Sequence, residues 1–153
     1  MADQTTSSIA IAAPPAAILA VIADFSSYPA WATGVQKTEV VAIGNDGRAQ
    51  RVHFVLDASP IKDEYTLEYR WDGERQVRWH LVEGRVLKAM QGAYELSADD
   101  GHTMVTYRLS VDVAMPLIGM LKRKAEKVII DAALKNLKQR VETTADQGGT
   151  PWG

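Results

Sequence analysis

The sequence predicts an α+β fold in which a curved antiparallel sheet wraps around one long C-terminal helix. A proline-started helix follows the first strand, six strand-like runs joined by short turns come next, and one long helical segment closes the chain. Short turns favour antiparallel neighbours, because parallel strands need crossovers of a dozen or more residues. The chain of 153 residues suits a single domain, expected over residues 1–143, with a flexible tail at 144–153.

The first strand is expected at Ser7–Ala12, where two consecutive prolines end it. Because proline presets the backbone of a first helical turn, we expect a helix from about Ala16. Three apolar side chains share one face of that helix: Ile18, Ile22 and Phe25. The segment 24–34 mixes turn residues with aromatic ones, which indicates a second short helical turn holding Tyr28, Pro29 and Trp31.

The middle of the chain reads as a meander of hairpins. The six expected strands are Val35–Ile43, Arg48–Leu56, Ile61–Trp71, Gln76–Glu83, Leu87–Ser97 and Thr103–Val113. Four turn sequences separate strands: Asn45-Asp46-Gly47, Ala58-Ser59-Pro60, Asp72-Gly73-Glu74 and Asp99-Asp100-Gly101. Apolar and polar residues alternate along several strands, as in the run Tyr65, Leu67, Tyr69 and Trp71, so one sheet face is expected to be buried.

The terminal helix is expected at Leu117–Glu142, after Pro116. Its second half carries an apolar stripe of Ile130, Ala133, Leu134, Leu137 and Val141. Continued toward the N-terminus, the stripe meets Gly119, Arg123, Glu126 and Lys127. Either the helix bends and packs through Leu117, Leu121, Ala125, Val128 and Ile129, or the charges are simply solvated, or they face the mouth of a cavity. In the last case Arg123 becomes a candidate anchor for an acidic head group.

Composition excludes several classes of protein. There is no cysteine, so disulfides, thiolate zinc sites and cysteine nucleophiles are absent. The 17 basic and 19 acidic residues give a net charge of −2, which indicates no nucleic-acid partner. No apolar run is long enough to span a bilayer, and residues 1–8 do not resemble a signal peptide. We expect a cytoplasmic protein without stable membrane insertion, monomeric or weakly dimeric.

No catalytic motif is recognisable, so we assign no catalytic residue, metal ligand or cofactor. His53 and His80 are expected on the outer sheet face and His102 in another strand or turn, and we interpret all three as surface residues rather than metal ligands. The adjacent Asp63 and Glu64 point to opposite faces of a strand, which argues against a paired-carboxylate site. We interpret them as a solvated strand start.

The inner sheet face is the candidate site. It concentrates tyrosine and tryptophan, and a buried phenol needs a hydrogen-bond partner, which favours a pocket holding water or ligand over a dry core. The alternative is an ordinary core whose phenol oxygens reach its rim. The candidate ligand-binding residues are Trp31, Phe54, Tyr65, Leu67, Tyr69, Trp79, Leu81, Tyr94, Tyr107, Leu109, Met120 and Arg123.

Several short segments, in their order and spacing from about Ser8 to Glu142, resemble the polyketide cyclase/dehydrase and lipid-transport branch of the START-like superfamily. They are Ala13-Pro14-Pro15 with Val21 and Asp24, Tyr28-Pro29-x-Trp31, Ile61-Lys62-Asp63-Glu64-Tyr65, Gly92-x-Tyr94-x-Leu96 and Gly101-x-Thr103-x-Val105-x-Tyr107, before a Lys/Leu-rich helix. The resemblance implies a helix-grip fold, with a seven-stranded sheet, two small helices after the first strand and a deep hydrophobic cavity. It implies no catalytic position.

We therefore expect the protein to bind or transport a small hydrophobic molecule, such as a lipid, fatty acid, polyketide or quinone, inside the domain. One alternative is a metal-free cyclase or dehydratase that uses Tyr65, Tyr69, Tyr107 or Arg123 for proton transfer or enolate binding. Another is a protein-interaction module on the same fold. Fold alone does not choose among them.

Overall fold

The computed structural model describes residues 4–58, 61–113 and 119–148. The first half contains β1 (Thr5–Ile11), α1 (Pro15–Ala23), the short 3-10 turn η1 (Phe25–Ser27), α2 (Tyr28–Trp31), β2 (Val35–Ile43) and β3 (Ala49–Ala58). The second half contains β4 (Ile61–Asp72), β5 (Gln76–Gly84), β6 (Leu87–Asp99), β7 (His102–Val113) and α3 (Gly119–Gly148). The predicted turn at Ala58-Ser59-Pro60 and the predicted helix start at Leu117 lie partly outside the described residues.

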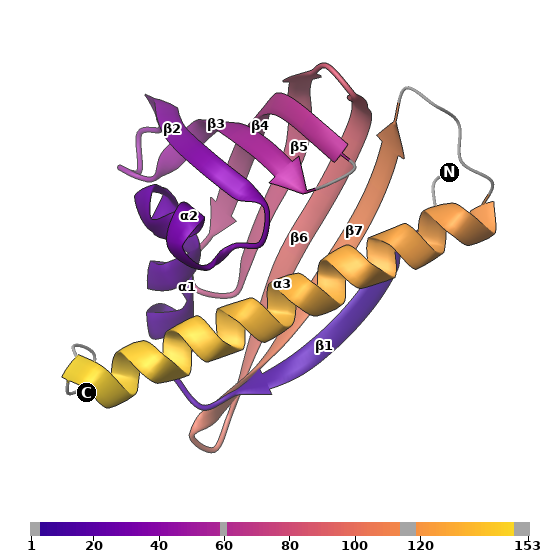
Figure 1. The fold of residues 1–153 in the computed structure, drawn as a ribbon. Coiled ribbons are helices and arrows are strands. Elements are labelled where there is room, and N and C mark those ends of the chain that lie inside the picture. Colours follow the sequence, from indigo (N-terminus) through magenta and orange to yellow (C-terminus); the bar gives the residue numbers. More distant parts are fainter. Residues whose placement is uncertain (1–3, 59–60, 114–118, 149–153) are drawn as a thin grey trace.

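The strands of the described chain form one seven-stranded antiparallel sheet in the order β1-β7-β6-β5-β4-β3-β2. The predicted fold is thereby confirmed, including the meander from β2 to β7. The first strand, β1, forms one edge of the sheet, where it pairs with the last strand, β7, and Thr5 lies opposite Leu109. The sheet curves, and α3 crosses its concave side above β1 and β7 (Figure 1).

Local sequence accounts for where the elements begin and turn. Pro15 occupies the first turn of α1, where the amide hydrogen that proline lacks has no helical partner in any case. Gly47 and Gly101 have φ of 80° and 81° in the β2–β3 and β6–β7 turns. Only glycine adopts this left-handed backbone without strain, which is why these hairpins close where the sequence predicts.

The core lies between the concave sheet face, α1 and α3. The predicted stripe on α3 is confirmed in its buried members Ile130, Leu134, Leu137 and Val141, all at most 3% exposed. On α1, Ile18 and Ile22 are buried, and Phe25 in η1 joins them. Because strand residues alternate between faces, the inner face of the sheet carries the apolar set and the outer face carries the charges.

The first half of α3 agrees with only part of what the sequence left open: Arg123 and Lys127 are exposed, as simple solvation predicts, but Glu126 is buried. The bend is wrong, since Ala125, Val128 and Ile129 are exposed; the side chains of Leu117 and Leu121 lie outside the described part. Glu126 is not solvated. It continues the buried stripe, 1% exposed, and accepts hydrogen bonds of 2.7 Å from both the Thr5 hydroxyl and the Val111 amide.

The interpretation of Asp63 as a solvated strand start is wrong. Asp63 lies on the inner face of β4 and is 5% exposed. Its two carboxylate oxygens accept the backbone N–H groups of Arg85, Val86 and Leu87 at 3.0, 3.2 and 2.9 Å. The carboxylate therefore holds the β5–β6 turn, a role that only the tertiary contact reveals. Glu64 is half-buried on the opposite face, as alternation predicts.

The end of α3 also differs from its predicted boundary at Glu142, since the helix continues to Gly148. The prediction followed the buried stripe, which stops at Val141, but residues 143–147 contain no glycine or proline to interrupt helical hydrogen bonding. The first residues of the predicted tail at 144–153 are thus helical, and residues 149–153 lie outside the described part.

Candidate functional site

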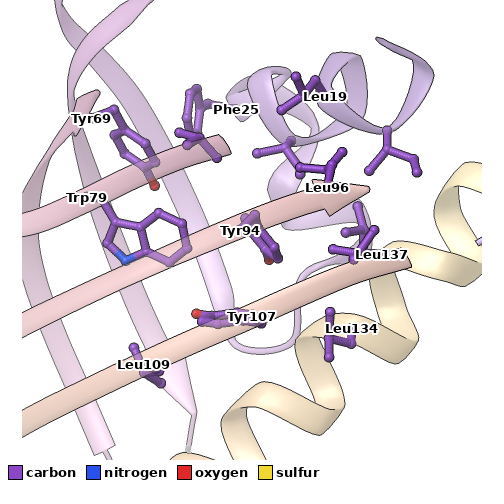
Figure 2. Packing of buried hydrophobic residues seen from close by; sticks show 14 of the residues in the cluster. Leu19, Phe25, Tyr69, Trp79, Tyr94, Leu96, Tyr107, Leu109, Leu134 and Leu137 are labelled. Atoms are coloured by element: carbon purple, nitrogen blue, oxygen red, sulfur yellow. The ribbon is translucent and has the colours of Figure 1, made fainter. Parts of the chain in front are cut away.

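The candidate site is a group of aromatic side chains on the inner face of the sheet, here called the aromatic cluster. Its members are Phe54 on β3, Tyr65 and Tyr69 on β4, Trp79 on β5, Tyr94 on β6 and Tyr107 on β7. Register explains the grouping, because Phe54 lies opposite Tyr65, Tyr69 opposite Trp79, and Tyr94 opposite Tyr107. Figure 2 shows Tyr69, Trp79, Tyr94 and Tyr107 projecting from neighbouring strands on the same side as Leu134 and Leu137 of α3.

The rings of the aromatic cluster form two contacting groups, which Phe25 of η1 joins by meeting Phe54 at 6.2 Å and Tyr69 at 4.9 Å. Tyr94 and Tyr107 have ring centroids 4.7 Å apart, and Trp79 meets Tyr107 edge-on at 5.5 Å. Tyr69 lies 5.7 Å from Trp79, while Phe54 stacks on Tyr65 at 5.3 Å. Such pairs add about 0.5–1.5 kcal/mol each beyond their buried area, so these contacts stabilise the cluster as an aromatic wall.

The polar atoms of this wall are largely unmatched by the protein. Among the described residues, no hydrogen-bond partner is found for the hydroxyls of Tyr65, Tyr69, Tyr94 and Tyr107. Among the described residues, only the indole Nε1 of Trp31, on α2, is both fully enclosed and without a partner, so the four hydroxyls each keep some accessible surface. Tyr28 differs, because its hydroxyl donates to the Ile22 carbonyl at 2.5 Å. Most buried polar groups in proteins are hydrogen-bonded, so this concentration is unusual.

Burial keeps these phenols protonated. It raises the pKa of Tyr65, Tyr69, Tyr94 and Tyr107 above the ordinary value, because an aromatic interior disfavours the phenolate. Neighbouring tyrosines raise the pKa of Tyr69 and Tyr107 further. At neutral pH all four are therefore neutral hydroxyls that can each donate one hydrogen bond.

Comparison with known families decides which family this fold represents. The sequence profile described as "Polyketide cyclase / dehydrase and lipid transport" matches residues 2–142, nearly the whole domain. The chain belongs to this family. The resemblance drawn from the short segments is thereby confirmed, although no match was found among curated proteins.

Solved structures show that other chains share the family's fold. A START superfamily protein from Mycobacterium smegmatis superposes with a TM-score of 0.86 at 20% identity, covering 92% of this chain and 98% of that one. A protein from Thermus thermophilus has a TM-score of 0.77 at 23% identity, with 94% and 99% coverage. The Zhui aromatase/cyclase from Streptomyces sp. R1128 has a TM-score of 0.75 at 16% identity, with 97% and 99% coverage. At these identities the likeness concerns the fold.

The other candidate residues occupy different places around the aromatic cluster. Leu67 and Leu109 are buried beside it on β4 and β7, and Leu81 on β5 is half-buried. Arg123 is exposed on the first half of α3, where it has partners of its own. Met120 lies in α3, but its side chain is outside the described part. As ligand contacts, all of these residues remain predictions.

Three aromatic residues that adjoin the cluster were not among the sequence-derived candidates. Phe25 packs edge-on against Tyr69 at 4.9 Å, and Trp71 stacks on Tyr69 at 5.9 Å. Tyr28 contacts Phe54 at 6.1 Å. The alternation along β4 already places Trp71 on the inner face, so the sequence carried that signal. The contacts of Phe25 and Tyr28 depend on how η1 and α2 dock, which no local pattern encodes.

The outer-face histidines have carboxylate neighbours that the sequence did not associate with them. His53 Nε2 lies 3.4 Å from Glu64, and His80 Nε2 lies 3.6 Å from Glu68. Each is a single pairing; within the described ranges, no three metal-ligating side chains come together. Within those same ranges, no helix is long and apolar enough to cross a bilayer.

Proposed function

We propose that the protein binds a small, largely apolar ligand between the aromatic cluster and α3, and carries it or shields it from water. The unmatched hydroxyls of Tyr65, Tyr69, Tyr94 and Tyr107 carry this proposal. Each of these hydroxyls keeps some accessible surface although its residue is at most 8% exposed, so four donors in one group favour an interior space in which a ligand or water accepts their hydrogen bonds.

The small solvent exposure that the aromatic side chains retain supports an enclosed space beside the aromatic cluster. Tyr94 and Tyr107 each retain 8% exposure, whereas Val105 and Leu109, on the inner face of β7 on either side of Tyr107, retain none. The difference is expected if the aromatic rings border a hollow while their aliphatic neighbours pack against protein. Ligand sites of this type are mostly apolar and carry a few convergent polar groups.

The chemistry of the wall favours a class of ligand. Its polar groups are neutral donors, the phenols and the indole N–H of Trp31, and the candidate anchor Arg123 is exposed rather than enclosed. Neutral donors match ligand carbonyl or ether oxygens, and aromatic faces match a planar ring system. Within the lipid, fatty acid, polyketide and quinone classes, the wall therefore favours the oxygen-bearing polyketide or quinone types over a saturated acyl chain.

The experiment is to recover the ligand and then remove single donors. We expect native mass spectrometry and solvent extraction of protein purified from its own host to give an apolar compound in proportion to protein. Tyr94→Phe and Tyr107→Phe should each weaken its binding about fivefold, the equivalent of one hydrogen bond. Tyr28→Phe is the matched control, because that hydroxyl is already bonded to Ile22.

An empty protein that also fails to bind quinone- and polyketide-like probes would contradict the proposal. So would equal weakening by all three Tyr→Phe variants, since the control hydroxyl faces a protein carbonyl. Recovery of a stable protein partner from the host with no small molecule would instead favour the interaction-module alternative.

A cyclase or dehydratase is the second candidate. Buried, protonated phenols can donate hydrogen bonds to an enolate oxygen that gains charge during ring closure, and Tyr69 and Tyr107 are held in that form. Their raised pKa makes them stabilisers of an oxyanion rather than bases. Turnover of a polyketone substrate, lost in Tyr107→Phe while binding persists, would support this function. Binding without turnover supports the carrier.

A further inference from the structure

The outer face of the sheet carries a row of arginines, opposite to the aromatic cluster. Arg70 on β4 pairs with Arg78 on β5, Arg78 pairs with Ala93 on β6, and Ala93 pairs with Arg108 on β7. Only the small Ala93 interrupts this arginine row, and all three arginines are exposed. Like charges placed directly opposite each other on antiparallel strands repel, so the row needs an explanation.

Elsewhere on this face, charges are paired across strands. Arg51 binds Glu68 at 3.1 Å, and Arg85 lies 3.3 Å from Glu64. Within the arginine row, Arg108 has Glu95 at 2.8 Å. Arg70 and Arg78 have no acidic partner anywhere in the described part of the chain. The two directly opposed arginines are thus the ones left without a counter-charge.

The arginine row borders a hollow of about 490 Å³ on this face. Arg70, Arg78 and Arg108 line it together with Gln4, Gln76, His80 and Gln91; Trp79 and Gly92 also border it, and Ala93 lies at its floor between Arg78 and Arg108. Ala93, whose side chain shares the outer face with Arg78 and Arg108, leaves room that a longer side chain would fill on an ordinary sheet surface. The lining therefore combines guanidinium groups and side-chain amides, which are hydrogen-bond donors.

We propose that this hollow binds a small molecule bearing two linked phosphates. A guanidinium holds a phosphate through two parallel hydrogen bonds, and the opposed pair Arg70 and Arg78 can share one such group. Neighbouring strands lie about 5 Å apart, so Arg108 stands roughly 10 Å beyond Arg78. That spacing, with flexible side chains converging over Ala93, suits a diphosphate better than a single ion.

The surroundings select a short anion rather than a nucleic acid. Glu68 and Glu95 flank the arginine row on the same face, and the chain as a whole has a net charge of −2. A long polyanion passing through the hollow would meet these carboxylates, whereas a diphosphate fits between them. The arginine side chains lie on the sheet face opposite to the aromatic cluster, and although Trp79 also borders the hollow, none of the four phenols of the interior site lines it.

The test is a titration of ¹⁵N-labelled full-length protein with sodium pyrophosphate at low ionic strength, following the arginine Nε–Hε signals. We expect saturable shifts of the Arg70 and Arg78 signals. Arg70→Gln and Arg78→Gln should each weaken binding about tenfold, which corresponds to one charge-assisted contact. Arg51→Gln is the matched control: it removes the same charge from the same face but from an arginine already paired with Glu68, and should change binding less than about twofold.

Ala93→Leu tests the hollow separately from its charge. The larger side chain fills the floor and keeps every arginine, so we expect about tenfold weaker binding with an unchanged melting temperature. If Ala93→Leu leaves pyrophosphate binding intact, the hollow is not the binding site. If Arg51→Gln weakens binding as much as Arg78→Gln does, the anion is attracted by the overall positive charge of this face and the proposed site is wrong. Orthophosphate bound as tightly as pyrophosphate, or an oligonucleotide bound more tightly than either, would overturn the diphosphate class.

Discussion

Gly92 on β6 lies directly beneath the indole of Trp79 on β5. A Cβ atom at position 92 would overlap the ring atoms Cε2 and Cζ2 of Trp79, so the ring occupies the space that any other residue's side chain would need. Across the β5–β6 pairing the two residues are direct partners. The glycine thereby sets the position of Trp79 in the aromatic cluster.

Gly92→Ala should therefore destabilise the protein by about 1–3 kcal/mol, the usual range for overpacking a filled site. Urea denaturation measures the change, and tryptophan fluorescence reports displacement of the indole. The control is a double-mutant cycle with Trp79→Ala, in which the added methyl no longer meets a ring and its cost should vanish. If Gly92→Ala costs the same folding stability with and without Trp79, the added methyl clashes with a group other than Trp79.

Asp63→Ala should cost about 2 kcal/mol of folding stability, because three N–H groups of the β5–β6 turn lose their acceptor. Glu64→Ala is the neighbouring control: its carboxylate makes only partly exposed pairs with His53 and Arg85 and should cost under about 1 kcal/mol. Chemical denaturation of the two variants compares these values. Equal losses would mean that the turn does not depend on Asp63.

The same carboxylate predicts a pH dependence. Burial alone would raise the pKa of Asp63, but the N–H groups of Leu87, Val86 and Arg85 outweigh it and hold the pKa below the ordinary value. A lowered folded-state pKa means that the stabilisation is complete above about pH 4 and is lost as the pH falls through the folded-state value. The stability gap between the wild type and Asp63→Asn should be constant from about pH 5 to 7 and shrink below about pH 4. A gap that widens on acidification would contradict this assignment.

Tyr107→Phe and Tyr28→Phe should affect ligand-free stability differently. The Tyr107 hydroxyl has no protein acceptor in the described chain, so its removal should be neutral or slightly stabilising. The Tyr28 hydroxyl donates to the Ile22 carbonyl, and its loss should cost about 1 kcal/mol. Thermal denaturation of ligand-stripped protein checks both. A clear loss of stability in Tyr107→Phe would indicate an acceptor inside the protein and weaken the case for a ligand there.

Glu126→Ala should destabilise the protein by about 1–3 kcal/mol, because the Val111 amide and the Thr5 hydroxyl lose a buried acceptor. Glu126→Gln keeps one acceptor oxygen in place and should cost less. Hydrogen exchange at the Val111 amide gives a local readout, with faster exchange expected in the alanine variant. Unchanged exchange at Val111 would show that this contact does not hold α3 to β7.

Much of the fold follows from local pattern. Alternation along β4, β5 and β7 correctly assigned Tyr65, Trp79 and Tyr107 to the inner face, since residues two apart on a strand share a side. Glycine-containing turns located the hairpins, because few other residues accept a positive φ. These features depend on near neighbours in the chain, so the sequence by itself determined the meander, the buried face and most of the aromatic cluster.

The tertiary structure decided where charged and polar groups find partners. Asp63 and Glu126 look like surface residues in the sequence, yet both are buried because backbone N–H groups far along the chain complete their hydrogen bonds. The pairing of β1 with β7 and the opposition of Arg70 to Arg78 likewise arise only when the strands align. The free energy of burying a polar side chain depends on the hydrogen-bond and charge partners that surround it, not on its position in the alternating pattern of a strand. The alternation of residues therefore could not reveal these sites.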